Sequence, residues 1–311
     1  MTCAWIFPGQ GSQTVGMAYD VYEAMPEARR LFDRAEEITG LPIAKLCFEG
    51  PADALQLTIH AQPCLLTACA ALMLPLQHAG NHPDDVAGHS IGEYTALFAA
   101  GVLSFEDALQ LVYRRGVIMH RMQRGTMTAI LGLSDDQAVA ACVAASSIGT
   151  VVAANFNAPG QVVISGQPEA VAEAGRIAKE MGATKVVPLK VSGAFHSPLM
   201  LPAAQELAEA IAVAPFKKGG ARVASNVDAA LSDDPDVLRD KLVRQLYSPV
   251  HWSDCMRTLQ LQGVTEVLEI GPGKVLAGLL RHIDRSLSIT SVNSLAVARQ
   301  IANEIPKHTT L

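Results

Sequence analysis

A serine between two glycines is the first feature of this sequence that could do chemistry. Gly88 to Gly92 read G-H-S-I-G, after a short apolar run and before a helix-like stretch. Between a strand and a helix, the pattern G-x-S-x-G holds the serine hydroxyl on a sharp turn, where the N–H of the next residue, Ile91, can stabilise an oxyanion. The glycines let neighbouring backbone approach closely. Ser90 is therefore the candidate nucleophile, although a plain strand-to-helix turn would leave the same pattern.

A serine nucleophile needs a general base, and the sequence contains nine histidines. His89 is adjacent to Ser90 in the chain, so we expect its ring to point away from the hydroxyl. His196 differs from the others because it lies in a Gly-Ser-Pro loop, residues 192–198, between an expected strand and an expected helix. Catalytic groups are often carried by loops set on rigid elements. His196 is thus the candidate base, and the residues around it supply no nearby acid to complete a triad.

One arginine lies on a helical stripe that is otherwise apolar. Leu111, Arg115 and Met119 are spaced i, i+4, i+8 and share one face of an expected helix. A guanidinium on a core-facing stripe requires an anion, so Arg115 is a candidate carboxylate-binding residue. The alternative is that its side chain reaches the surface, as we expect of the neighbouring Arg114.

Two glycine-rich segments resemble phosphate loops without matching one. Residues 9–13 read G-Q-G-S-Q after a strand but lack the G-x-G-x-x-G spacing, and residues 271–274, G-P-G-K, lack the Walker spacing. The spacing argues against a dinucleotide or ATP site. The amide of Gln10 can instead donate to an oxyanion or hold a carboxylate, and a simple loop role is the alternative.

The candidate residues above lie in a long chain whose composition and pattern predict a mixed α/β fold. The chain has 311 residues, of which 50% are hydrophobic and 17% are charged, which predicts one large domain with an insertion or two domains. Apolar runs predict strands at 4–7, 85–89, 222–226 and 266–270. Helical patterns are found at 17–39, 63–79, 92–100 and 104–122, the last capped by Ser104.

The middle of the chain has a different pattern of secondary structure, in which short predicted strands are more frequent. Its pattern predicts strands at 127–133, 151–157, 161–166 and 184–190, with helices at 135–146 and 168–182. The order β-α-β-β-α-β is that of a ferredoxin-like unit. We therefore expect a small subdomain at 124–192, inserted into a large domain made of 1–123 and 193–311.

Composition excludes several classes of partner. The net charge is −6 and no run of Lys and Arg stands out, which argues against nucleic acid. The six cysteines are scattered without a CxxC pair, as in reduced cytoplasmic proteins. No signal peptide is apparent, and no apolar stretch suggests a membrane span of ~20 residues.

Taken together, these motifs resemble the malonyl-CoA:acyl carrier protein transacylases and the related acyltransferase domains of fatty acid and polyketide synthases. The resemblance runs the length of the chain. It rests on FPGQGSQ (7–13), QP (62–63), GHSIGEY (88–94), RG (115–116) with Met119, NFNAPGQ (155–161), GAFHSP (193–198), QLYSPV (245–250) and GPGK (271–274). The family implies an α/β-hydrolase-like core with an inserted ferredoxin-like subdomain.

The resemblance also implies roles for individual residues. Ser90 would be the nucleophile and His196 its base, oriented by the backbone carbonyl of Gln245. Gln10 and the N–H of Ile91 would form the oxyanion hole. Further substrate-binding positions are implied at Arg115, which would pair with the malonyl carboxylate, at Asn155 and Asn157 on the coenzyme A or carrier side, and at Gln62, Met119 and Phe195. Phe195 belongs to a pattern that in this family accompanies malonyl rather than methylmalonyl.

The expected function is a ping-pong transfer of malonyl from coenzyme A to an acyl carrier protein through acyl-Ser90, with no metal or redox cofactor. We expect a cytoplasmic enzyme, with a monomer as the expected oligomeric state. Lys185, Lys190 and Lys274 are candidates for a basic patch that binds the acidic carrier. The alternatives are a serine hydrolase or thioesterase with water as acceptor, the malonyltransferase subunit of a malonate decarboxylase, and a non-catalytic docking subunit.

Overall fold

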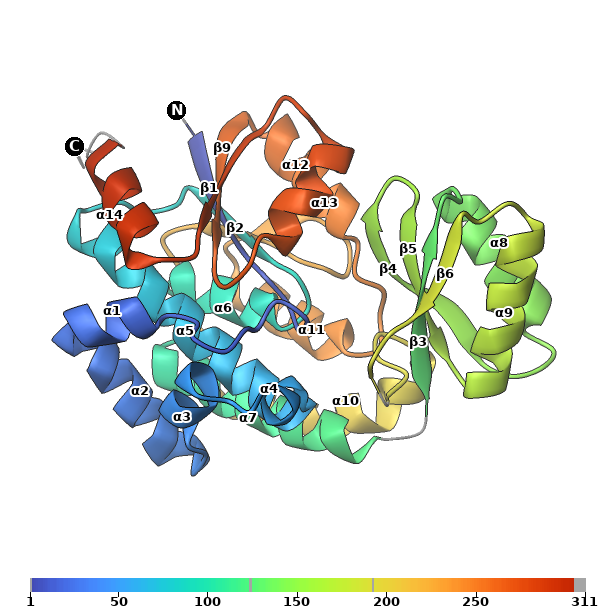
Figure 1. The fold of residues 1–311 in the computed structure, drawn as a ribbon, viewed down its shortest axis with the longest axis horizontal. Helices are drawn as coiled ribbons and strands as arrows, with labels where there is room; N and C mark the ends of the chain where they lie inside the picture. Colours follow the sequence, from blue (N-terminus) through green and yellow to red (C-terminus); the bar gives the residue numbers. More distant parts are fainter. Residues whose placement is uncertain (1, 123–124, 192, 305–311) are drawn as a thin grey trace.

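A six-stranded sheet forms the centre of the larger part of the molecule. The computed structural model describes residues 2–122, 125–191 and 193–304. The strand order of this sheet is β10-β9-β1-β2-β7-β8, and Figure 1 labels β9, β1 and β2. The strands are β1 (Thr2–Phe7), β2 (Asp85–Gly88), β7 (Arg222–Ala224), β8 (Leu231–Ser232), β9 (Val264–Ile270) and β10 (Ser288–Val292). All neighbours are parallel except β7 and β8, so the functional loops follow the carboxyl ends of the parallel strands.

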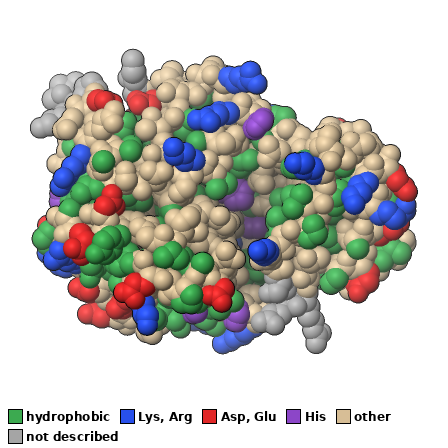
Figure 2. All heavy atoms as spheres, in the orientation of Figure 1, with side chains coloured by type: hydrophobic (Ala, Val, Ile, Leu, Met, Phe, Trp, Pro, Cys, Tyr) green, Lys and Arg blue, Asp and Glu red, His purple; other side chains and the backbone are tan. Residues whose placement is uncertain are grey.

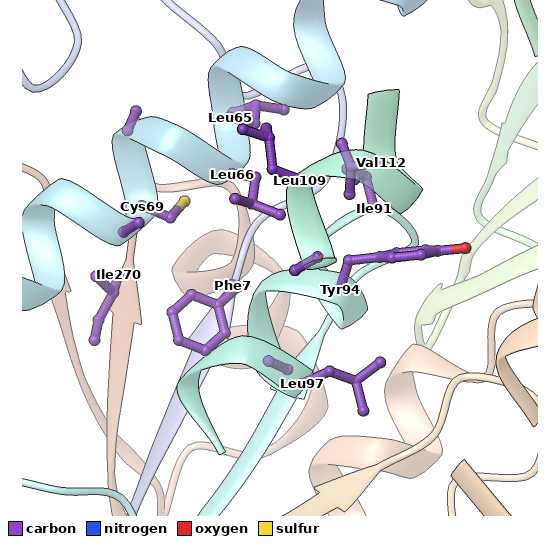
Figure 3. Close-up of a cluster of buried hydrophobic side chains, with 14 of the residues drawn as sticks. Phe7, Leu65, Leu66, Cys69, Ile91, Tyr94, Leu97, Leu109, Val112 and Ile270 are labelled. Carbon is purple, nitrogen blue, oxygen red and sulfur yellow. The ribbon is translucent and has the colours of Figure 1, made fainter. Parts of the chain in front are cut away.

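Helices cover both faces of this sheet. Along β1, Trp5 and Phe7 point into one core cluster, while Ala4 and Ile6 point into a second cluster on the other face. Figure 3 shows the first cluster, where Phe7 lies among side chains of α5 and β9. A strand that is buried on both faces reads as a continuous apolar run, which is why the residues at 4–7 predict a strand.

The larger part contains these helices: α1 (Tyr19–Ala24), α2 (Pro26–Thr39), α3 (Ile43–Phe48), α4 (Ala52–Gln56), α5 (Thr58–His78), α6 (Gly92–Ala99), α7 (Phe105–Arg121), α10 (Leu201–Val213), α11 (Pro235–Gln245), α12 (Trp252–Leu261), α13 (Val275–Ile283) and α14 (Leu295–Glu304). A 3-10 turn, η1 (Pro198–Met200), precedes α10. The α7 helix begins as predicted, since the Ser104 side chain accepts a hydrogen bond from the Asp107 N–H.

Two helix predictions were wrong, one in its interior and one at its start. The single helix expected over 17–39 is broken at Met25, whose φ of −127° is extended because the following residue is Pro26. The helix expected at 63–79 begins earlier, at Thr58, and keeps Pro63 in its interior.

The α5 helix also corrects the expectation that no apolar stretch approaches the length of a membrane span. By length and composition, its 21 residues could cross a membrane, and 83% of its most apolar window is buried inside the protein. It packs against α2, α7 and α14. This helix is therefore part of the protein core.

A second, antiparallel sheet lies beside the large part, to the right in Figure 1. Its order is β4-β5-β3-β6. The unit consists of β3 (Thr126–Leu131), α8 (Asp135–Ala145), β4 (Val151–Ala158), β5 (Gln161–Gly166), α9 (Pro168–Glu180) and β6 (Lys185–Pro188). The element order and the α/β fold class are confirmed. The boundaries of the subdomain fall at positions 123–124 and 192, outside the described residues, and stay a prediction.

Strand β4 joins the small sheet to the large part. The Val250 N–H donates to the Ala154 carbonyl at 2.8 Å, and the Phe156 N–H donates to the Val250 carbonyl at 2.9 Å. The Phe156 ring stacks on His251, with ring centroids 5.2 Å apart. The two parts are thus fixed to each other by backbone hydrogen bonds at the edge of the cavity described next.

Candidate active site

Ser90 lies on the tight turn that joins β2 to α6. Its φ of 53° is in the left-handed region, which is strained for a residue with a side chain. A Cβ at Gly88 would lie 1.9 Å from the Gly92 carbonyl carbon, and a Cβ at Gly92 would lie 2.2 Å from the Phe7 carbonyl oxygen. Only glycine fits at these two positions, so the expected close approach of the backbone is present.

The structure brings His196 to the serine, although the two residues are far apart in sequence. The Ser90 Oγ lies 2.7 Å from the His196 Nε2. On the other side of the ring, the Nδ1 lies 2.9 Å from the Gln245 backbone carbonyl oxygen. A carbonyl oxygen only accepts, so Nδ1 carries the ring proton and Nε2 is free to accept the serine proton.

His196 is held in its neutral form. Its ring is buried, and burial together with the nearby Arg115 charge lowers the pKa of His196 to about 3. The hydrogen bond to Gln245 opposes this shift without cancelling it. A neutral imidazole is the form that can take a proton from a serine hydroxyl.

Arg115 also reaches the serine. Its side chain is 1% exposed. The Nη1 donates to Gln62 Oε1 at 2.9 Å, and the Nη2 donates to Ser90 Oγ at 3.1 Å and to Gln245 Oε1 at 3.3 Å. The helical stripe of Leu111, Arg115 and Met119 is buried as predicted, and Arg114 is exposed.

The buried guanidinium has only neutral partners. Among the residues that the structure describes, no carboxylate forms an ion pair with Arg115, and the Nε makes no hydrogen bond. The guanidinium carbon lies 5.6 Å from the centroid of the Tyr94 ring. Burial lowers the pKa of Arg115, and the group stays cationic at neutral pH. A buried cation whose direct partners are all neutral, beside a nucleophile, is suited to an anionic ligand.

Gln10 and Ile91 lie at the same cavity as the serine. The Ile91 N–H donates to no other described residue, so it is available to an oxyanion. The Gln10 Nε2 instead donates to Thr58 Oγ1 at 3.3 Å, and its second amide proton remains for a ligand. Both groups are therefore within the cavity where an oxyanion hole would be needed.

The cavity has a volume of about 230 Å³ and lies between the two parts of the molecule. Figure 2 shows histidine side chains in the hollow between the large body and the small unit. We define the polar wall as Gln10, Ser90, Arg115 and His196, and the apolar wall as Met127, Val163, Leu189, Val191 and Phe195.

Most of the other expected binding residues are also at this cavity. Met119, Asn155, Asn157 and Phe195 line it. The Asn157 Oδ1 lies 2.8 Å from the His89 Nε2, so His89 bonds to the asparagine instead of the serine. Gln62 is fully buried behind the cavity, where it accepts from Arg115 and donates to Met119 Sδ at 3.3 Å. It therefore contacts the arginine that faces the cavity.

A larger groove of about 630 Å³ lies along α7 and α10, lined by residues such as Arg114, Arg121 and Glu206. None of the candidate catalytic residues lines it. The chemistry thus belongs to the smaller cavity.

Sequence reasoning missed two polar residues beneath the serine. The Asn226 Oδ1 accepts from the Ser90 N–H at 2.7 Å, and its Nδ2 donates to the Gly88 carbonyl at 2.7 Å. Glu93 accepts from Asn226 and Gln245. A signal was available for each: Asn226 is the polar last residue of the strand predicted at 222–226, and Glu93 is a charged residue in the apolar start of α6.

Comparison with known proteins places the chain in a family. Residues 4–309 match the family described as acyl transferase domain. The malonyl CoA-acyl carrier protein transacylase of Bacillus subtilis (strain 168) is 44% identical over 93% of this chain and 93% of its own length. That of Escherichia coli (strain K12) is 44% identical over 93% of this chain and 95% of its own.

Solved structures of similar fold carry the same family names as the sequence relatives. The acyl-carrier-protein S-malonyltransferase of Burkholderia pseudomallei 1710b has 46% identity and a TM-score of 0.94, covering 97% of this chain and 100% of its own. A malonyl-transacylase solved in complex with its type II polyketide acyl-carrier protein has 39% identity and a TM-score of 0.94, covering 98% of this chain and 100% of its own. From its fold, its serine turn and these similarities over nearly its whole length, the chain belongs to the family of malonyl CoA-acyl carrier protein transacylases.

Proposed function

We propose that this protein transfers a malonyl group from malonyl-CoA to the phosphopantetheine thiol of an acyl carrier protein, through an acyl-Ser90 intermediate. The observation that carries the proposal is the buried Arg115, which has no carboxylate in direct contact among the described residues and lies 3.1 Å from the nucleophile. A thioester with a terminal carboxylate brings the missing anion to this cation, and its carbonyl carbon to the serine.

In the first half-reaction, the Ser90 Oγ attacks the thioester carbonyl carbon while His196 Nε2 takes the hydroxyl proton. The negative charge that develops on the carbonyl oxygen is stabilised by the Ile91 N–H and the Gln10 amide. The carbon–sulfur bond then breaks, and His196 returns its proton to the sulfur of coenzyme A. Malonyl remains on Ser90 as an ester.

In the second half-reaction, the same groups act in reverse order. The carrier thiol gives its proton to His196 and attacks the ester carbonyl, and Ser90 leaves as an alcohol by taking the proton back. The backbone carbonyl of Gln245 holds the ring in one tautomer throughout. Every proton and charge is handled by residues of the chain, so the proposed reaction uses no metal or redox cofactor.

The other expected binding residues receive roles in the same scheme. Arg115 binds the malonyl carboxylate with two parallel hydrogen bonds, Gln62 holds the guanidinium in place, and Met119 packs beside it. Phe195 fills the space beside the α-carbon of the acyl group. Asn155 and Asn157 lie on the side from which the pantetheine chain enters.

A serine hydrolase or thioesterase would use the same serine and base with water as acceptor. Arg115 favours the transferase, because a general esterase has no use for a buried cation at the acyl group. The malonyltransferase subunit of a malonate decarboxylase shares these motifs, and the relatives named above favour the transacylase. A non-catalytic docking subunit would not need the bonded Ser90 and His196 pair.

The test uses a panel of acyl-CoAs and carrier proteins, with intact-protein mass as the readout. Malonyl-CoA should add malonyl mass to the wild type and none to Ser90→Ala, and adding holo carrier protein should move that mass to the carrier. Coenzyme A release should stop after one turnover without carrier. Sustained release would indicate a hydrolase, and no adduct on the wild type would indicate a docking protein.

The pathway, the cellular location and the oligomeric state are also proposals. We propose a role in fatty acid or polyketide synthesis, because both pathways use malonyl groups on acyl carrier proteins and one similar solved structure is a malonyl-transacylase in complex with a type II polyketide acyl-carrier protein. The six cysteines are free and buried, which supports a cytoplasmic enzyme. A monomer is proposed because both walls of the cavity come from one chain.

A further inference from the structure

A buried carboxylate lies directly beneath the proposed active site and has no part in the mechanism above. Glu93 is 1% exposed, in the first turn of α6. It accepts hydrogen bonds from Gln245 Nε2 at 2.7 Å, from Ser225 Oγ at 2.9 Å and from the Asn226 N–H at 3.3 Å. A buried carboxylate is costly unless such donors satisfy it, so its presence here needs a reason.

Gln245 connects this carboxylate to the site. Its Nε2 donates both to Glu93 and to the Ser90 carbonyl oxygen, the latter at 2.8 Å, while its Oε1 accepts from Arg115. Its backbone carbonyl accepts from His196. One residue therefore contacts the acyl-binding cation, the nucleophile's backbone and the base.

Glu93 decides which way round the Gln245 amide lies. If the amide were turned over, its NH2 group would face the donating Arg115 guanidinium and its oxygen would face the Glu93 carboxylate. Both contacts would be repulsive, since a guanidinium has no acceptor and a carboxylate has no donor. Glu93 and Arg115 therefore both bond to the Gln245 side-chain amide, and together they fix its orientation.

Burial raises the pKa of Glu93, while its hydrogen bonds from Gln245, Ser225 and Asn226 favour the carboxylate. As a carboxylate, Glu93 is the negative charge that faces Arg115 through that amide. In the free enzyme, the arginine has only neutral direct partners, and Glu93 supplies charge compensation across one side chain. A malonyl carboxylate would then compete with Glu93 for the same cation. The charge of Glu93 and its hydrogen bonds therefore have separable effects: the charge weakens binding of the anionic acyl group, and the bonds hold the base.

We infer that Glu93 is a positioning residue for acyl transfer, which acts through Gln245 to orient Arg115 and His196 and to moderate the binding of a carboxylate-bearing acyl group. The inference rests on the proposed function. It assigns to an acid outside the cavity a part of the selectivity for malonyl over uncharged acyl groups.

Two substitutions separate the charge from the hydrogen bonds. In Glu93→Gln, the side-chain oxygen can still accept from Gln245 and Asn226 while the new amide donates to Ser225 Oγ, so the charge is lost and the bonds remain. In Glu93→Ala, both are lost. Asp85→Asn is the matched control, because Asp85 is a fully buried carboxylate at the far end of β2, paired with Arg222 at 2.7 Å.

The experiment measures kcat and KM for malonyl-CoA and acetyl-CoA with holo carrier protein. Glu93→Gln should lower the KM for malonyl-CoA, on the order of threefold to tenfold, because a competing charge is removed from a buried site, where water screens charges less than at the surface. The KM for acetyl-CoA should stay unchanged. Glu93→Ala should lower kcat for both acyl groups by about tenfold to a hundredfold, because the base and serine lose their alignment. In Glu93→Gln, kcat should fall far less.

Asp85→Asn should reduce thermal stability and leave both kinetic parameters at wild-type values. If Glu93→Gln changed malonyl and acetyl kinetics alike, or matched the control, Glu93 would have only a structural role and the inference would fail. Failure of the wild type itself to form a malonyl adduct would refute the proposed function instead. If Glu93→Ala does not fold, the Glu93→Gln result decides the matter by itself.

Discussion

The polar wall and the apolar wall of the cavity hold their side chains in different ways. On the polar wall, Ser90 is joined by hydrogen bonds to the buried His196 and Arg115. On the apolar wall, side chains such as Val163 and Leu189 are positioned by packing against the core. Hydrogen bonds fix atoms to within tenths of an ångström, whereas packing fixes volume. The first wall is thus suited to chemistry and the second to shape selection.

Removing the chemical groups of the polar wall should have the largest effect. Ser90→Ala and His196→Ala should each lower malonyl transfer by about 10⁴-fold or more, because nucleophile and base act as a unit. The double variant should be no worse than either single variant, measured as kcat/KM with holo carrier protein. Multiplied losses would show that another residue acts as base.

Removing the cation should separate charged from uncharged acyl groups. Loss of one partner of a buried charged pair costs roughly 3–5 kcal/mol, which is on the order of a hundred- to a few-thousand-fold in malonyl transfer by Arg115→Ala. Acetyl transfer should fall far less, or rise. The exposed neighbour provides the control, Arg114→Ala, which should change neither. Equal losses for malonyl and acetyl would make Arg115 a structural residue.

A change on the apolar wall should alter shape selection and leave the chemistry. Phe195→Ser opens space beside the acyl α-carbon, so methylmalonyl transfer should rise relative to malonyl by the equivalent of about 1–3 kcal/mol. Phe195→Leu keeps most of the bulk and should keep most of the discrimination. The measurement is kcat/KM for the two acyl-CoAs. An unchanged ratio in Phe195→Ser would show that the methyl group is excluded elsewhere.

The burial of the polar wall should also be visible in pH-dependent stability. His196 titrates at about 3 in the folded protein, from an ordinary value of 6.5 for this pKa. As pH falls below 6.5, the unfolded chain binds a proton that the folded chain does not, so the contribution of this group to stability is complete above 6.5 and is lost down to about pH 3.

His196→Gln removes this titration. Its free energy of unfolding should therefore decrease less than that of the wild type between pH 7 and pH 5, by about 2 kcal/mol, measured by chemical denaturation. On the apolar wall, Val163→Ala should destabilise the protein equally at both pH values. The same low pKa predicts that acylation remains active at pH 5. A parallel loss in wild type and His196→Gln would contradict the burial argument.

The smallest effect is expected outside both walls, at the cavity mouth. Lys190 and Lys274 are exposed, and each is next in sequence to a lining residue, Val191 or Val275. If they attract an acidic carrier, raising ionic strength should raise the KM for carrier protein by a few-fold, more than that for malonyl-CoA. Lys190→Ala and Lys274→Ala should weaken this salt dependence, and the exposed Lys179→Ala on α9 should not. Equal salt responses of both substrates would argue against the patch.

The same two walls show what a sequence can predict. Ser90 and Arg115 were predicted from local patterns, a glycine-flanked turn and a helical stripe, because the residues that define each pattern are neighbours along the chain. The partners of these groups were not predictable in this way, since Asn226 and Gln245 come from segments more than a hundred residues away. The role of Gln245 came only from family resemblance, because the group in question is a backbone carbonyl that every residue has.

The fold was also predictable from the sequence only in part. The order of strands and helices followed from periodicity, and the small sheet from its β-α-β-β-α-β order. The break at Met25 had a signal in Pro26 that the apolar spacing on both sides concealed. The early start of α5 was missed because Pro63, a typical first residue of a helix, lies inside it.

The backbone pairing of Val250 with β4 has a mechanical consequence. The chain runs from Gln245, which holds the histidine ring, to Val250, which is bonded on both its N–H and its carbonyl to the small sheet. This short segment therefore connects the His196 ring at one end to β4 at the other. A displacement of β4 relative to the large sheet would therefore also move the carbonyl that holds the His196 ring.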